Sequence, residues 1–278
     1  MTAISLHAAP SWRVIAVEQT RAVGLRMRGA GVLLLVIQVG LAAAMLDAAA
    51  RARAIYERHP GRGAMSMTNI TFSPQVAVIF SFLALLVPLL VWEGEDPTRR
   101  LYHWSMPVGQ PSHAVTKALG GWLWLMLAVT VSVAGMAVVP LFVERITGQP
   151  QTYAPHFTWW EWIVPFVSAT IAYVFASAAA LGTRQPLVWI FGSMLIYGGG
   201  LALFGKSDIP VLVDVSRAMV TGIAGTYGVA AAVAGTIDQV DAAGRVAAPS
   251  LVRWTGASAL WGAVGAALFY LTARRREG

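Results

Sequence analysis

The chain has 278 residues, of which 57% are hydrophobic and only 12% are charged, and its mean hydropathy is +0.63. Soluble domains carry roughly 25% charged residues, and a core built from this length cannot hide so much apolar surface, so the composition excludes an ordinary soluble protein. We assign the net charge of +7 to arginines that flank membrane segments rather than to nucleic acid, and the absence of cysteine excludes disulfides and cysteine-bound metal.

A basic leader occupies residues 1–28. Its apolar residues recur near helical spacing, and its arginines lie largely off that stripe. The stripe consists of Trp12, Ile15, Val23 and Met27, and the arginines are Arg13, Arg21 and Arg28. This pattern predicts an amphipathic helix that lies on the cytoplasmic surface of a membrane.

Six later runs are apolar over about 18 residues or more, the length that a helix needs to cross roughly 30 Å of hydrocarbon. They are Ala30–Ala49, Pro74–Trp92, Ala118–Val143, Trp162–Gly182, Leu187–Gly205 and Trp254–Ala273. The expected fold is therefore an all-α integral membrane protein with six transmembrane helices in a single domain, residues 1–278. Gln38 is the deepest strongly polar side chain, and it fits either an interhelical hydrogen bond or a contact in a substrate path.

Six spans place both termini on one side of the membrane. That side receives eleven lysines and arginines and the other side nine, and Arg274, Arg275 and Arg276 end the chain on the richer side. The positive-inside rule then predicts cytoplasmic termini in a bacterial-type inner membrane.

The segment 206–253 precedes the last span and contains a charge-free run, Ala218–Ile237, made mostly of Ala, Gly and Thr. Such a run inserts poorly by itself. It predicts one or two short helices that are re-entrant or lie at the outer interface, with a seventh span as the alternative.

A polar passage, "WEGEDPTRRLYHWSMPVGQPSHAVTKALGGWLW", joins the second and third spans. Asp96, Pro97 and Thr98 are typical of a helix start, and two later prolines are typical of its end. The residues predict a short rigid helix that projects into the cytoplasm. Its aromatic and basic side chains fit either a protein interface or a capped connector at the headgroups.

This passage resembles the segment that follows the second span in ABC-2-type transporter permeases. Members of that family usually read Glu-x-x-x-Gly-Thr, a short helical run, and then Leu-Pro-Val-Ser-Arg, with a lysine ten residues after the proline. Here Glu93, Thr98 and Pro107-Val108 match, and Lys117 stands ten residues after Pro107. Pro97 replaces the usual glycine, and Gly109-Gln110 replaces Ser-Arg.

The resemblance implies a permease subunit of an ATP-binding cassette exporter, with residues 93–117 as the coupling-helix loop that docks on a separate ATP-binding subunit. The interface residues it implies are Glu93, Thr98, Arg99, Arg100, Tyr102, His103, Trp104, Pro107 and Lys117. It also implies a second permease subunit, identical or paralogous, with the substrate path between the two. ATP and Mg²⁺ belong to the partner, and this chain is expected to bind no cofactor or metal and to hold no catalytic residue.

Sequence motifs that are typical of several other classes of protein are absent from the sequence. It contains no GxxxxGK[ST], no HExxH and no GxSxG, and all five histidines fall outside the predicted spans. The first alternative is a polytopic membrane enzyme or assembly factor without an ATPase partner. The second, an ion-coupled carrier, is disfavoured because such carriers usually hold carboxylates near the membrane midplane.

Overall fold

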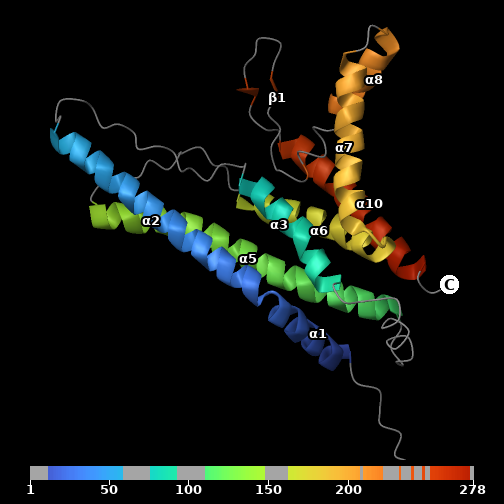
Figure 1. Ribbon diagram of the computed structural model, residues 1–278, viewed down its shortest axis with the longest axis horizontal. Coiled ribbons are helices and arrows are strands. Elements are labelled where there is room, and N and C mark those ends of the chain that lie inside the picture. The colour runs from blue at the N-terminus through green and yellow to red at the C-terminus, as the bar shows by residue number, and fades with distance from the viewer. Residues whose placement is uncertain are drawn as a thin grey trace, which may run out of the picture.

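The computed structural model describes residues 12–58, 76–92, 110–147, 162–206, 209–221, 232, 239–240, 246–247 and 251–275 (Figure 1). This part of the chain is almost entirely helical. The elements are α1 (Trp12–Arg26), α2 (Arg28–Arg58), α3 (Val76–Trp92), α5 (Gln110–Thr147), α6 (Val164–Gly182), α7 (Pro186–Gly205), α8 (Pro210–Thr221), β1 (Gln239–Val240), β2 (Val246–Ala247) and α10 (Leu251–Arg275).

Three helical stretches among the described residues are long and apolar enough to cross a membrane. They are His113–Gly135 in α5, Val164–Gly182 in α6 and Leu251–Arg274 in α10. Length and composition thus indicate a helical membrane protein, as the sequence predicts. Most or all of each of the six predicted spans lies in one helix (α2, α3, α5, α6, α7 or α10), and the crossing of the membrane by all six stays a prediction.

Helix α2 continues to Arg58, nine residues beyond the predicted end of the first span at Ala49. The added residues are mostly alanine, arginine and glutamate, which are strong helix formers, and they include neither glycine nor proline. Arg51 forms an ion pair with Asp47 one turn earlier on the exposed side of the helix. A hydropathy profile locates only the apolar part of a helix. The helix itself continues as far as residues of high helix propensity continue.

The leader forms a helix of its own, α1, which leads almost directly into α2. Backbone hydrogen bonds from Met27 N to Val23 O (2.9 Å) and from Gly31 N to Met27 O (2.9 Å) run across the boundary at Met27. Figure 1 shows α1 running alongside α5 rather than across it. Val23 and Met27 are buried, as the predicted apolar stripe requires, and Arg13, Arg21 and Arg28 are exposed.

The core lies where α3, α5, α6 and α10 meet. Helix α6 is central, because α3 and α10 both pack along it and α5 crosses it. Its small residues, among them Ala169, Ala172 and Ala176, are fully or nearly fully buried and let neighbouring backbones come close. Among the described residues, Tyr173 is the largest fully buried side chain, and its hydroxyl donates to the carbonyl oxygen of Ala118 on α5 at 2.7 Å.

Glycines permit neighbouring helices to approach α5 closely on two sides. On one side, Trp124 of α5 lies over Gly24 of α1, and its Nε1 donates to Thr20 O at 3.0 Å. A β-carbon at Gly120 would lie 3.3 Å from the Thr20 backbone. On the opposite side, Gly121 leaves room for Tyr173 and for Val91 of α3, which a β-carbon at that position would meet. The Gly120-Gly121 pair therefore allows α5 to be covered on two sides at once.

The contacts also fix the direction of the helices. The C-terminal ends of α3, α6 and α10 and the N-terminal end of α5 lie at one end of the bundle, where Trp92 contacts Lys117 and Gly182 contacts Thr272. We call this the loop end, because residues 93–109 leave α3 and enter α5 there. Figure 1 shows the C-terminus at this end, and β1 and α8 toward the other.

The segment before α10 contains helix α8, which begins at Pro210, eight residues before the charge-free run, and therefore includes Asp214. A proline suits the first turn of a helix, and the residues after it alternate apolar and polar at helical spacing. Most of Ala218–Ile237 lies outside the described residues. The short antiparallel pair of β1 and β2, in which Gln239 faces Ala247, was not predicted.

Candidate functional site

The two ends of the polar loop are held together by a cation–π contact. Lys117 Nζ, on α5, lies 4.8 Å from the ring centroid of Trp92, the last residue of α3. Both side chains are nearly buried, with exposed fractions of 6% for Lys117 and 7% for Trp92. We call this pair the loop base.

Burial gives this contact more weight than it would have on a surface. A lysine over an indole ring contributes about 0.5–1 kcal/mol when exposed and about 2 kcal/mol when desolvated. The neighbours of Lys117 on the helix, Ala114 and Ala118, are also buried, so its ammonium is held in an apolar part of the bundle. The resemblance implies that Lys117 is an interface residue, and the structure places it buried against Trp92, the residue that precedes the loop.

Helix α1 braces the loop base from the outside. The guanidinium of Arg26 donates to the carbonyl oxygen of Val91 at 3.3 Å, next to Trp92. This carbonyl belongs to the last turn of α3, where backbone acceptors have no partner within the helix. A cation at a helix C-terminus also interacts favourably with the helix dipole. The leader, the second predicted span and the third are therefore joined within one small region.

The other predicted interface residues cannot be placed in the same way. Glu93, Thr98, Arg99, Arg100, Tyr102, His103, Trp104 and Pro107 lie outside the described residues. Gln38 lies in the middle of α2, and its side chain is outside the described part.

Sequence reasoning missed two members of this region, Trp92 and Arg26. Trp92 reads as the end of an apolar run, and Arg26 reads as one of several arginines in a basic leader. No local signal separates Arg26 from Arg21 or Arg28. Their different roles depend on the packing of α1 against α5.

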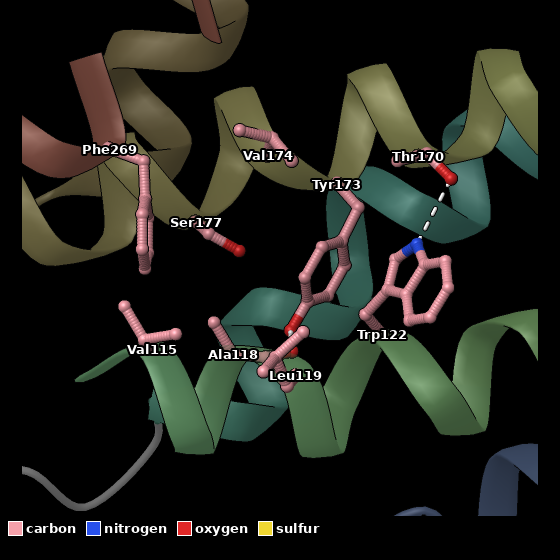
Figure 2. Close-up of a pocket in the computed structure, with 9 residues that line it drawn as sticks. All are labelled: Val115, Ala118, Leu119, Trp122, Thr170, Tyr173, Val174, Ser177 and Phe269. Carbon is pink, nitrogen blue, oxygen red and sulfur yellow. Dashed lines mark hydrogen bonds between the residues drawn. The ribbon is translucent and has the colours of Figure 1, made fainter. Parts of the chain in front are cut away.

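A second feature is an apolar pocket between α5, α6 and α10, with a cavity volume of ≈ 240 Å³ (Figure 2). Its lining residues are Val115, Ala118, Leu119, Trp122, Thr170, Tyr173, Val174, Ser177 and Phe269. Trp122 Nε1 donates to Thr170 Oγ1 at 3.0 Å and so joins α5 to α6 at one end of the pocket. Among the described residues no group of three or more His, Cys, Asp or Glu is placed to hold a metal ion.

The fold and the loop base define the class of this protein as a helical membrane protein whose polar loop is anchored at one end of the bundle. Family models, curated proteins and solved structures give no match to the chain. The particular function is therefore argued from the loop and from the structure around it.

The loop base leads to a test by a double-mutant cycle. We expect Trp92→Leu to lower the free energy of unfolding by about 2–3 kcal/mol, since it removes buried aromatic surface and the ring under a buried cation. In a Lys117→Met background the same change should cost about 1 kcal/mol less, because no cation remains to lose its partner. Thermal unfolding of the four purified proteins in detergent measures both values.

A matched cycle between Trp92→Leu and Leu127→Met provides the control. Leu127 is an exposed residue on the same helix as Lys117, and its coupling energy with Trp92 should be near zero. Equal costs of Trp92→Leu with and without Lys117 would show that the cation–π contact has no net effect.

Proposed function

We propose that this chain is the membrane-spanning permease subunit of an ATP-driven exporter of the ATP-binding cassette type. The observation that carries the proposal is the match of residues 93–117 to the coupling-helix loop of that family, together with the anchoring of the loop at Trp92 and Lys117. A loop that transmits movement from another subunit must be tied firmly to the helices that it moves. The loop base meets this requirement, because it joins the ends of α3 and α5 and receives Arg26 from α1.

In this proposal the segment between Thr98 and Pro107 forms a short helix that docks into a groove on a separate ATP-binding subunit. Arg99, Arg100, Tyr102, His103 and Trp104 contact that subunit, and Glu93 and Pro107 shape the two ends of the helix. Lys117 acts as a positioning residue under the loop. ATP and Mg²⁺ are bound by the partner, and their binding and hydrolysis shift the loop and the helices attached to it.

The direction of the helices supports the proposed topology. The loop, the C-terminal ends of α6 and α10, and the basic residues Arg184 and Arg274 gather at one end of the bundle. Under the positive-inside rule this end is cytoplasmic, which places both termini in the cytoplasm if six helices cross an inner membrane. Segment 206–253 then lies on the outer side.

Two helices carry apolar faces that a second permease subunit would cover. Exposed fractions on α2 are 58% for Leu33 and 64% for Leu35, and on α7 they are 77% for Leu195 and 79% for Ile196. Lipid covers part of such surface in any membrane protein. We propose that the rest faces the second subunit, identical or paralogous, and that Gln38 on α2 lies along the substrate path between the two.

The test is purification of the tagged chain from its native host in mild detergent, followed by an assay of vanadate-sensitive ATP hydrolysis. We expect an ATP-binding subunit to co-purify. The double change His103→Ala and Trp104→Ala should weaken its association about thirtyfold, the effect of losing roughly 2 kcal/mol at an interface anchor. Trp189→Ala is the matched control, because Trp189 is an exposed tryptophan on α7, 64% accessible, and is not among the proposed interface residues.

Unchanged association in the double variant, with the membrane domain still folded, would contradict the assignment of the coupling helix. A chain that purifies alone under conditions in which membrane complexes survive would favour the alternative, a membrane enzyme or assembly factor without an ATPase.

A further inference from the structure

The apolar pocket between α5, α6 and α10 is open on the side that faces outward from the helix bundle. Val115 and Leu119 of α5 line it and are 42% and 52% exposed, so they form its rim. Phe269 of α10 stands on the opposite side, and Val174 and Ser177 of α6 form the back (Figure 2). A ligand could therefore enter sideways from the lipid phase.

Carbon atoms make up most of the inner surface of the pocket. Tyr173 turns its hydroxyl to the carbonyl oxygen of Ala118, and Trp122 turns its Nε1 to Thr170, so both aromatic side chains have their polar atoms paired within the bundle. What remains is rings, methyl groups and methylenes, together with the buried hydroxyl of Ser177. Such a lining is almost wholly apolar and suits a hydrocarbon chain.

The deep end of the pocket lies about the depth of one bilayer leaflet from the loop end of α6. The Trp122–Thr170 hydrogen bond closes its deep end, and α6 ends at Gly182, twelve residues after Thr170. At 1.5 Å per residue this distance is about 18 Å, close to half of the roughly 30 Å hydrocarbon core. An acyl chain that enters at the loop end would thus reach the hydrogen-bonded pair near the bilayer midplane.

Positive charge lies near the end of the pocket that is closer to the loop end of the bundle. Arg184 follows α6 by two residues and Arg274 lies in the last turn of α10, and both side chains are exposed. The two helix ends are close together, because a β-carbon at Gly182 would lie 3.0 Å from Thr272 Cγ2. Neither α6 nor α10 contains an acidic residue. A phosphate group at this level would meet two cations and no carboxylate from these helices.

We propose that the pocket holds one acyl chain of an anionic phospholipid from the leaflet at the loop end, with its phosphate at Arg184 and Arg274. This lipid lies between α5, α6 and α10. It is a resident structural lipid of the fold, and the proposal holds whether or not the chain serves an ATP-driven exporter.

The experiment uses the full chain in lipid nanodiscs of phosphatidylcholine that contain a small fraction of phosphatidylglycerol with a diazirine on one acyl chain. After irradiation, the labelled residues are identified by peptide mass spectrometry. We expect labels on Val115, Leu119, Val174 and Phe269. Replacing both arginines, by Arg184→Gln and Arg274→Gln, should lower this labelling by about fivefold for each charge removed.

Two matched controls make the outcome specific. Val115→Trp fills the rim and should abolish labelling inside the pocket, whereas Leu123→Trp, at an exposed position on the same helix outside the pocket, should leave it unchanged. Arg145→Gln removes an exposed charge from the other end of α5 and should also have no effect. Equal labelling by diazirine phosphatidylcholine would overturn the choice of an anionic lipid. Labelling that persists in Val115→Trp, or that spreads evenly over all exposed apolar residues, would overturn the site itself.

Discussion

Replacing Gly121 with leucine is expected to lower the free energy of unfolding by about 3 kcal/mol or more, the upper range for overpacking a core. A β-carbon at this position already meets the Tyr173 hydroxyl and a methyl group of Val91, which come from two different helices. Neither can withdraw easily, because the Tyr173 ring is rigid and fully buried and Val91 is 0% exposed. The larger side chain must therefore push α3 and α6 away from α5.

The measurement is thermal unfolding in detergent, followed by the loss of the monodisperse peak in size-exclusion chromatography. A decrease of about 3 kcal/mol corresponds to a melting temperature lower by roughly 6–12 °C for a chain of this size. Gly256→Leu on α10 is the matched control, since no atom lies within 4 Å of a β-carbon there. Equal melting temperatures for the two variants would contradict the close crossing of α5 with α3 and α6.

Removing the Tyr173 side chain is the second change with a large expected effect. Tyr173→Ala should cost about 3–5 kcal/mol, because it removes a buried aromatic ring and leaves a cavity at the centre of the bundle. Tyr173→Phe keeps the ring and removes only the hydrogen bond to Ala118, so it should cost about 1 kcal/mol.

The same unfolding assay tests the series, with Tyr270→Ala as control. Tyr270 lies on α10 with an exposed fraction of 56%, and its removal should change stability little. If the phenylalanine and alanine variants were equally unstable, the hydroxyl rather than the ring would be responsible, and the packing account of this position would be wrong.

The positions of the helices could be predicted well because each depends on a local property of the chain. Runs of apolar residues predict α2, α3, α5, α6, α7 and α10, and each of these helices contains most or all of its predicted span. The differences lie at the ends. Arg58 ends α2 and Pro210 begins α8, and at both places helix-forming residues or a proline decide the boundary, where hydropathy carries little information.

The candidate site was predicted only in part, because its three described members, Lys117, Trp92 and Arg26, come together through tertiary contacts. The spacing from Pro107 to Lys117 draws attention to the lysine, and nothing in the sequence indicates that its ammonium lies over Trp92. The role of Arg26 could not be predicted for the same reason, since its hydrogen bond to Val91 joins residues 65 positions apart.

Local stretches of sequence are enough to predict a membrane protein, the positions of most of its helices, and a polar loop with prolines between two of them. The helices can be predicted because lipid offers no hydrogen bonds to the backbone, so each apolar segment must pair its own backbone groups. The contacts between helix faces, in contrast, are known only from the three-dimensional structure. Gly121 faces Tyr173, Lys117 faces Trp92, and the pocket forms between α5, α6 and α10 because side-chain shapes at distant positions fit one another. Packing of this kind depends on the arrangement of several segments together, and no single segment specifies it.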